Sequence, residues 1–448
     1  MSAERLSALD ASFLAVESET APMHVGWVST YAAPKDGPTP GFDDLFAFLA
    51  GRFARAPHWR RKLAPVPLGV HEPAWVDDPD FDPAEHLLHA PGDDLDAIVD
   101  DVFSEPLPRD RPLWQIWIAD ELPEGRVALI GKAHHCMVDG IAIVELGKLL
   151  LDAEPFEDRG EAEAWEPAPT PSGRERFVRA VYDRAGDGAS LALAPVKLAG
   201  SPGRLRGVPG LARTLAHTLL PPAPDSPLNC PGSPRRRHVR RTRSLDELRT
   251  IRRAFGVSPN DVVLATCAGA LREYAGPQRL KVMVPADVRG AGDAEGGNRI
   301  SFVFLELPCD EPDPIARLET IHAATSQRAG DRDAEGLDAA FQALAIAPGP
   351  VKQVLAHAFA HPRMSNLTIS SVPGPATTRY MAGCKLETVH SAVPLSERHA
   401  LSIGVVMTSG NVCFGIYADA ETLPDADELG EELDLAFGEL LSAAAAAT

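Results

Sequence analysis

The chain has 448 residues, more than one hydrophobic core normally serves, so two domains or subdomains are expected. A composition of 45% hydrophobic and 24% charged residues is ordinary for a globular enzyme. The formal net charge of -20 argues against general nucleic-acid binding, because phosphate recognition needs positively charged faces.

Six cysteines are scattered along the chain without a CxxC pair, so neither a zinc knuckle nor a disulfide framework is indicated. The N-terminal segment carries acidic residues early and lacks a long apolar core, which is unlike a signal peptide. No run approaches the roughly 18 uninterrupted apolar residues of a membrane-spanning helix. We therefore expect a cytoplasmic protein with reduced thiols that at most lies peripherally on a membrane or lipid-droplet surface.

Hydrophobic periodicity predicts alternating strands and helices in the first part of the chain. We expect strands over residues 25–31, 65–76, 110–118 and 127–135, and helices over residues 43–55, 94–103 and 140–151. The strands over 110–118 and 127–135 should pair across the turn at Pro123-Glu124-Gly125.

The character of the chain changes between residues 157 and 234, where prolines, glycines and acidic residues cluster. An amphipathic helix over 174–184 lies within this stretch, so we interpret it as a crossover linker carrying one or two helices. The basic run over 235–243 follows. It is interpreted either as a solvated strand, as a contact for an anionic ligand, or as a segment attracted to an acidic lipid surface.

The second part of the chain again alternates strand and helix, which indicates an α/β fold. Ser258 is a candidate N-cap for a helix that has Pro259 in its first position. Further helices are expected over 245–255, 313–327 and 425–445, and strands over 281–285, 300–307 and 366–372. The strands over 401–407 and 412–417 should form a hairpin across 409–411.

The chemistry of the chain points to His134-His135-Cys136-Met137-Val138-Asp139-Gly140, which lies where a buried strand turns into a helix. Neighbouring strand residues point to opposite faces, so only one of the two histidines can face a given cleft. This favours one catalytic imidazole and one packing partner over a two-histidine metal site. Asp139 either orients that imidazole or holds the turn, and Gly140 suits a crowded backbone. A buried structural histidine pair is the alternative.

Several other catalytic signatures are absent from the sequence. It has no GxSxG nucleophile elbow, no P-loop and no GxGxxG following a strand. A histidine base that acts directly on a bound hydroxyl, amine or thiol therefore fits better than covalent catalysis.

The segment His134–Gly140 resembles the HHxxxDG signature of acyltransferases related to chloramphenicol acetyltransferase. Further stretches resemble the bacterial wax ester synthase/diacylglycerol acyltransferase family in particular, namely residues 6–14, 22–26, 112–114, 258–263, 284–301 and 366–375. The similarity covers nearly the whole chain in the right order. Two places depart from the pattern: Ala286-Asp287 stands where a small residue and serine are expected, and Ser371 where asparagine is common.

The resemblance implies an α/β fold of two chloramphenicol acetyltransferase-like subdomains, each a mixed sheet with helices. The expected boundaries are 1–156 for the N-terminal subdomain, 157–234 for a helical crossover linker and 235–448 for the C-terminal subdomain. An active-site tunnel would run between the subdomains, with acyl-CoA and the acceptor entering from opposite ends.

The resemblance also implies that His135 is the general base of an acyl-CoA-dependent O-acyltransferase, with His134 and Asp139 completing the catalytic motif. Asp139 would form a structural ion pair, for which Arg289 is the candidate partner, beside the turn at Gly140. The acceptor would be diacylglycerol, a long-chain alcohol or both, and acyl-CoA would be a co-substrate with no cofactor or metal. Two alternatives stay open: another hydroxyl acceptor, such as a polyketide or sugar lipid, and a non-catalytic lipid-binding protein.

Supporting residues follow from the same resemblance. Asn260 is a candidate polar group near the reacting oxygen, with helix capping beside Ser258 as the alternative. Pro112, Leu113 and Trp114 either pack behind the motif strand or line the acyl path. The remaining substrate-binding candidates are Asn298, Ser301 and Ser371.

Overall fold

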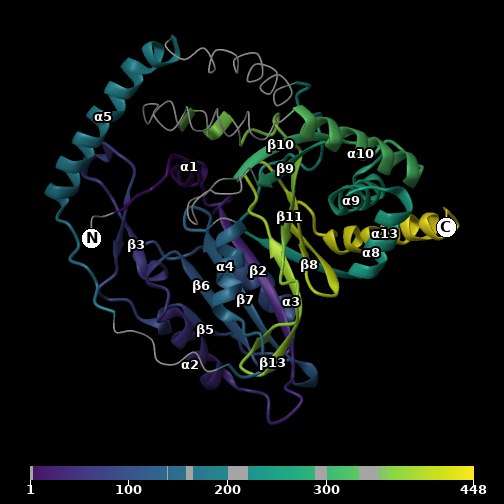
Figure 1. Ribbon diagram of the computed structural model, residues 1–448, viewed down its shortest axis with the longest axis horizontal. Helices are drawn as coiled ribbons and strands as arrows, with labels where there is room; N and C mark the ends of the chain where they lie inside the picture. Colours follow the sequence, from purple (N-terminus) through teal and green to yellow (C-terminus); the bar gives the residue numbers. More distant parts are fainter. Residues whose placement is uncertain are drawn as a thin grey trace.

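The structure is a computed structural model that describes residues 4–138, 140–157, 165–199, 220–287, 300–331, 353–354, 356–358 and 360–447. Within these ranges the strands form two six-stranded sheets and one three-stranded sheet. Figure 1 shows the two large sheets side by side, the first built mainly from N-terminal strands and the second with helices packed on its outer side.

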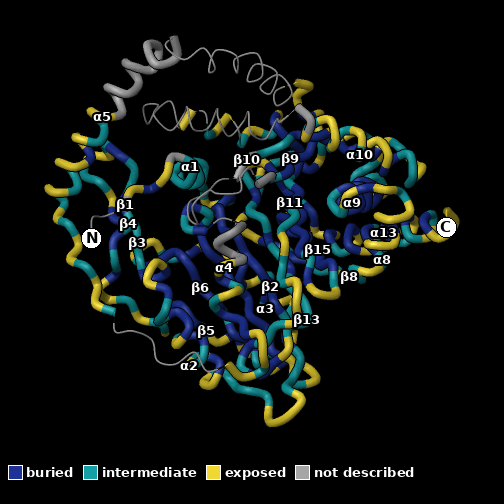
Figure 2. Tube along the Cα trace, viewed as in Figure 1, coloured by how far each residue is buried: buried dark blue, intermediate teal, exposed yellow. Residues whose placement is uncertain are grey.

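The first large sheet has the strand order β12-β13-β2-β7-β6-β5. Its strands are β12 (Tyr380–Met381), β13 (Cys384–Ala392), β2 (His24–Ala32), β7 (Val127–His134), β6 (Trp114–Ala119) and β5 (Leu87–His89). β5 runs parallel to β6, and the other neighbours are antiparallel. All residues of β7 are buried, so this strand forms the centre of the sheet (Figure 2).

Alternation along β7 sends its side chains to two separate cores. Val127, Leu129 and Ala133 join the cluster under α2 (Phe42–Phe53) and α4 (Gly140–Leu150). Ala128 and Ile130 join a second cluster with α3 (Leu95–Ser104) on the opposite face. Both faces of the sheet are therefore covered, which explains why the strand reads as a continuous apolar run.

The small sheet has the order β1-β4-β3, from β1 (Glu4–Arg5), β4 (Ala74–Asp77) and β3 (Arg61–Ala64). The predicted single strand over 65–76 was wrong: β3 ends at Ala64, a 3-10 turn follows at Pro67–Gly69, and β4 begins at Ala74. The prolines at 65 and 67 explain the break, because proline lacks the N–H that a ladder needs. Other 3-10 turns lie at Pro57–Arg60, Pro83–Glu85 and Pro123–Gly125.

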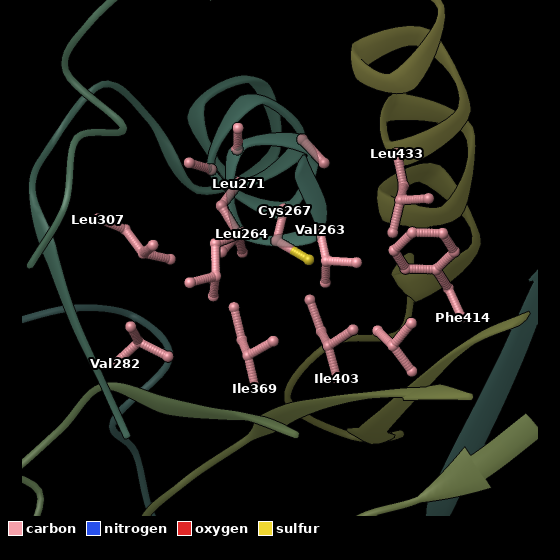
Figure 3. Close-up of a cluster of buried hydrophobic side chains, with 14 of the residues drawn as sticks. Val263, Leu264, Cys267, Leu271, Val282, Leu307, Ile369, Ile403, Phe414 and Leu433 are labelled. Atoms are coloured by element: carbon pink, nitrogen blue, oxygen red, sulfur yellow. The ribbon is translucent and has the colours of Figure 1, made fainter. Parts of the chain in front are cut away.

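The second large sheet has the order β10-β9-β11-β14-β15-β8. Its strands are β10 (Ile300–Leu307), β9 (Leu280–Asp287), β11 (Leu367–Pro373), β14 (Leu401–Met407), β15 (Asn411–Asp419) and β8 (Arg236–Ser244). The helices α8 (Leu245–Phe255), α9 (Pro259–Ala275), α10 (Pro314–Asp331) and α13 (Ala426–Ala447) belong to this half. Figure 3 shows Val263, Leu264 and Cys267 of α9 facing the strand residues Ile369 and Ile403 across the core.

Most of the predicted elements are confirmed, including the hairpin between β14 and β15 and the turn between β6 and β7. The helix expected over 174–184 is longer, as α5 (Gly173–Ala199). The elements that were missed are α1 (Ala8–Val16), β13 and the short strands β1, β3, β5 and β12. Among the described residues no single helix is long and apolar enough to cross a membrane; α8 and α9 pass such a test only when joined across a bend of 100°.

β13 interlocks the two halves, because it pairs with β2 in the first sheet although it lies among second-half strands in the sequence. Its Ser391 presses on the second sheet so closely that Cβ atoms added at Gly404 and Gly415 would lie 2.3 and 2.1 Å from it. Ser402 Oγ also donates to Val393 O, 2.7 Å away. The predicted domain division does not account for this exchange, and its boundaries at 156 and 234 stay a prediction.

The basic run forms β8, and the interpretation of it as a solvated strand was wrong. Arg237 pairs with Asp100 of α3 at 2.7 Å and with Asp427 of α13 at 2.6 Å. Arg240 pairs with Asp96 of α3, and the buried Arg236 donates to Thr20 O at 2.6 Å. These cations are therefore paired within the protein and hold the first half against the second.

Candidate active site

β7 is the element that carries the motif into position. The register pairs Gly131 with Trp27 of β2, and a Cβ at Gly131 would lie 2.1 Å from the Trp27 ring. Only glycine lets the indole lie across the strand at this point. The same register sets His24 opposite His134, the last residue of β7. α4 then begins at Gly140, so His135 lies in the turn between strand and helix, whereas Asp139 lies outside the described residues.

His134 is enclosed and neutral. Its backbone N–H donates to Leu113 O at 2.9 Å, and its Nδ1 accepts a hydrogen bond from the Cys136 N–H at 3.0 Å. The ring proton of the neutral form is therefore on Nε2, which lies 3.7 Å from Glu17 Oε1. Burial, with further effects of Arg109, His24 and His135, lowers the pKa of His134 well below its usual value.

His135 is more accessible to solvent than His134, and it contacts Met23 through its backbone and Phe13 through its ring. Its backbone N–H donates to Met23 O at 2.9 Å. Its ring stacks on the Phe13 ring, with centroids 3.8 Å apart and planes 10° from parallel. The two histidines differ in burial, with His134 fully buried at the end of β7 and His135 half-buried in the turn that follows, so the predicted alternation along a strand does not extend to His135.

Met23 adopts an uncommon backbone conformation, with φ of 51°. Few non-glycine residues occupy this left-handed region, and those that do often lie at functional sites. Here the conformation directs the Met23 carbonyl to the His135 N–H. Sequence reasoning singled out the Pro22-Met23-His24 stretch only through resemblance and did not predict this contact.

α1 brings two side chains to the histidine pair. Phe13 stacks on His135, and Glu17, the C-cap residue one turn later, lies near His134 and forms an ion pair with Arg109. Ser7 caps the helix by accepting from Asp10 N at 3.0 Å. The Ser7-x-x-Asp10 spacing before an apolar run is the signal that would have revealed this helix.

Basic side chains lie near His24 and His134. His24 is buried, and burial with the nearby charges of Lys132 and Arg236 lowers its pKa to about 3. Lys132 donates from Nζ to Val102 O and Glu105 O, both at 2.6 Å, at the end of α3. Burial lowers the pKa of Lys132 to about 8. Two neutral imidazoles thus lie close to basic side chains.

The predicted Pro112, Leu113 and Trp114 are all buried, and the contacts of Leu113 and Trp114 are with core residues. Leu113 is fully buried in a cluster with Leu6 and Cys136, while its carbonyl holds the His134 N–H. Trp114 stacks on Phe53 at 4.2 Å and donates from Nε1 to Trp59 O at 2.7 Å. These are the contacts of packing residues, which was the alternative to lining an acyl path.

Asn260 occupies the second position of α9, and the helix is capped by Ser258 together with Asp261. Ser258 and Asp261 form a capping box, with Asp261 N donating to Ser258 Oγ at 3.1 Å. Asp261 Oδ1 and Oδ2 also accept from Thr325 at 2.7 Å and pair with His322 at 2.8 Å. Burial alone would raise the pKa of Asp261, but these hydrogen bonds lower it. The capping alternative for Asn260 was therefore wrong, because Ser258 and Asp261 make the capping hydrogen bonds.

Ser301 and Ser371, two of the remaining candidates, lie on strands of the second sheet. Ser301 is paired with Ala286 across β10 and β9, and Ser371 with Val405 across β11 and β14. Arg289 and Asn298 lie outside the described residues, so the expected ion pair of Asp139 with Arg289 stays a prediction. Within the described ranges no group of three or more His, Cys, Asp or Glu side chains is arranged to hold a metal ion.

Comparison with known proteins decides the family. A model of the wax ester synthase/diacylglycerol acyltransferase catalytic domain matches residues 6–263, and a model of the C-terminal domain of the same family matches residues 296–441. The chain belongs to this family. It is an acyltransferase of the wax ester synthase/diacylglycerol acyltransferase type.

Relatives and solved structures agree with the family. A protein of Mycobacterium tuberculosis named as a probable diacylglycerol O-acyltransferase is 32% identical over 96% of this chain and 97% of its own length. The structure of the wax ester synthase/diacylglycerol acyltransferase from Marinobacter aquaeolei VT8 matches with a TM-score of 0.70 and 25% identity, covering 99% of this chain and 100% of that one. A condensation domain of the calcium-dependent antibiotic synthetase shares the fold, with a TM-score of 0.64, 17% identity, and 99% and 96% coverage.

Proposed function

We propose that this acyltransferase moves a long-chain acyl group from acyl-CoA to diacylglycerol, a long-chain alcohol or both, with His135 as the general base. The observation that supports the role of His135 is its position. It is the half-buried imidazole of the motif, at the end of a fully buried strand, with its backbone bonded to Met23 O and its ring stacked on Phe13. A base with a fixed position loses little orientational freedom when the acceptor binds.

In the proposed reaction His135 takes the proton of the acceptor hydroxyl as that oxygen attacks the thioester carbonyl. The tetrahedral intermediate then collapses, the C–S bond breaks, and the imidazolium gives its proton to the leaving CoA thiolate. A neutral His134 suits this step, because a charged neighbour would oppose protonation of His135.

The transfer is direct and passes through no acyl-enzyme. The thiol within the motif, Cys136, is 3% exposed, and burial raises its pKa, so it is a poor nucleophile. Acyl-CoA serves as a co-substrate, and neither a metal nor a resident cofactor takes part in the proposal. The substrates would meet in a tunnel between the two halves, where exclusion of water limits hydrolysis of the thioester.

Thiol release from palmitoyl-CoA, measured with dioleoylglycerol or hexadecanol, tests the proposal. His135→Ala should reduce turnover by about 10²–10⁴-fold while acyl-CoA binding survives. The control is His89→Ala. His89 is a partly exposed histidine at the end of β5, and its side chain pairs with Asp120. Normal turnover by His135→Ala would refute the base assignment.

The acceptor is tested separately from the base. If neither acceptor reacts but a polyketide or sugar-lipid hydroxyl does, the acceptor is wrong and the base assignment stands. Lipid binding by the wild type without turnover on any hydroxyl would indicate the non-catalytic alternative.

We also propose that α5 is the contact with a membrane or lipid-droplet surface. Val178, Val181 and Tyr182 are 48%, 46% and 77% exposed, and their spacing of three and four places them on one face. The opposite face is anchored, since Arg184 donates to Val70 O at 3.2 Å and Arg176 to Pro65 O at 3.1 Å. Figure 1 shows α5 along the outer edge of the molecule.

Flotation with vesicles that contain anionic lipid tests this surface. The triple variant Val178→Ser, Val181→Ser, Tyr182→Ser should float less than the wild type. Leu435→Ser is the control, because Leu435 is 61% exposed on α13 in the other half. Equal flotation of the triple variant and the wild type would contradict the assignment to α5.

A further inference from the structure

The stack of Phe13 on His135 is tighter than the other stacks of described histidines. Its centroids are 3.8 Å apart and its planes 10° from parallel, whereas Phe81 and His86 stack at 5.1 Å and 22°, and His86 and Trp114 at 4.5 Å and 23°. Face-to-face contact at this distance restricts rotation of the imidazole about its χ2 bond.

The position of Phe13 is itself fixed by the helix that carries it. α1 is capped at its start by Ser7, and at its end Glu17 pairs with Arg109. Between these ends Leu14 packs on the cluster of Leu6, Leu113 and the motif residue Cys136. The phenyl ring is therefore held relative to the turn that carries His135.

The stack on Phe13 fixes the direction in which the His135 ring nitrogens point. Both imidazole nitrogens lie in the ring plane, so a fixed plane fixes the direction in which the accepting lone pair points. The phenyl face also attracts a cation, so the same contact favours the imidazolium that forms when His135 takes a proton. An aromatic ring that met only the edge of His135 would neither fix the imidazole plane nor place its face against the imidazolium.

We propose that Phe13 is a positioning residue for acyl transfer, which holds the imidazole plane of His135 by stacking. The inference rests on the proposed role of His135 as the base. Phe13 touches the base and acts through it, so its loss should affect the chemical step more than substrate binding.

The test is steady-state thiol release from palmitoyl-CoA by the full chain. Phe13→Leu should lower kcat by on the order of tenfold with KM for palmitoyl-CoA nearly unchanged, because a free imidazole spends less time in the productive orientation. Phe13→Tyr retains the aromatic face and should keep kcat close to the wild-type value. Phe81→Leu is the matched control, since it removes the same atoms from the stack on His86 in the same half.

Thermal melting and a double-mutant cycle separate the possible failures. If Phe13→Leu melts early, Phe13→Met provides a flexible side chain of similar size, and the same fall in kcat is expected. In a His135→Ala background Phe13→Leu should cause no further loss. Unchanged kcat in Phe13→Leu, a raised KM alone, or an equal loss in Phe13→Tyr would overturn the inference while leaving His135 as base. Full turnover by His135→Ala would instead overturn the proposed function.

Discussion

At the scale of single residues, burial decides what each histidine can do. His134 and His135 are neighbours in sequence, yet only His134 is fully enclosed, with its Nδ1 occupied by the Cys136 N–H. The hydrogen bond fixes the tautomer of His134, and burial keeps it neutral. The residue next to the base is therefore a structural part of the site.

Buried neutral histidines make the protein sensitive to acid. Burial and the nearby Arg240 lower the pKa of His390 to about 3, against 6.5 for the free side chain. His390 therefore takes up a proton more readily in the unfolded chain than in the folded protein. Above pH 6.5 it is neutral in both states and the folded protein keeps its full stability, and part of this stability is lost progressively as pH falls toward 3. At pH 5 the unfolding free energy should be about 2 kcal/mol lower than at pH 7 because of His390 alone.

Urea unfolding at pH 7 and pH 5 measures the effect, with His390→Gln compared with the wild type. The variant should lose less stability between the two pH values, because glutamine takes up no proton. Thr242, which shares a 3.0 Å hydrogen bond with His390 Nε2, can bond to the glutamine amide as well. Identical losses in both proteins would show that His390 is not the titrating group.

At the scale of elements, β7 combines two requirements in one strand. It is buried on both faces, and at Gly131 it has no side chain, so that the Trp27 ring can lie against its backbone. His134 is its last residue, and His135 follows in the turn. The strand is predictable from its apolar run. The contact with Trp27 is not, because Trp27 lies on β2, far away in sequence.

Gly131→Ala tests how tightly this element is packed. The new Cβ would lie 2.1 Å from a carbon of the Trp27 ring, so the indole must move, and we expect a loss of about 1–3 kcal/mol of unfolding free energy. Gly51→Ala is the control on α2, where an added Cβ meets nothing within 4 Å. That change should stabilise the protein by up to about 1 kcal/mol, as alanine does in helices. A Gly131→Ala protein as stable as the wild type would mean that Trp27 has room to shift.

At the scale of the whole molecule, the halves are joined by a shared strand and by ion pairs. β13 completes the first sheet while it packs on the second, and β8 pairs with acids of α3. The base of the proposed reaction lies in the first half, so a stable contact between halves preserves the geometry of the site. Basic side chains of β8 thus form ion pairs within a protein whose net charge is -20.

Arg236→Leu removes the contact with Thr20 O of the first half together with a buried ion pair to Asp419 of β15, the neighbouring strand of the second sheet. Arg236 and Asp419 side chains are both 1% exposed and lie 3.6 Å apart, so the variant leaves a buried carboxylate without its cation. We expect a loss of about 3–5 kcal/mol of unfolding free energy, measured by urea unfolding. Arg249→Leu, in an exposed pair with Asp246, should change it by less than about 1 kcal/mol. Equal effects of the two variants would contradict a stabilising role for the buried contacts of Arg236.

Local signals were sufficient for much of the fold. The apolar period gave the helices over 43–55, 94–103 and 245–255, and the Ser258-Pro259 pair marked the start of α9. The failures have local causes as well. The prolines at 65 and 67 broke a predicted strand, and Asp261 rather than Asn260 completes the capping box with Ser258.

The sequence by itself determined the α/β class, the family and the two-histidine motif, because strand alternation and short motifs depend on neighbouring residues. Only the tertiary structure decided that Phe13 stacks on His135, that β13 joins the first sheet, and that the basic run is paired internally. These are contacts between segments far apart in the chain. They depend on which surfaces the folded core brings together, and no local period records that choice.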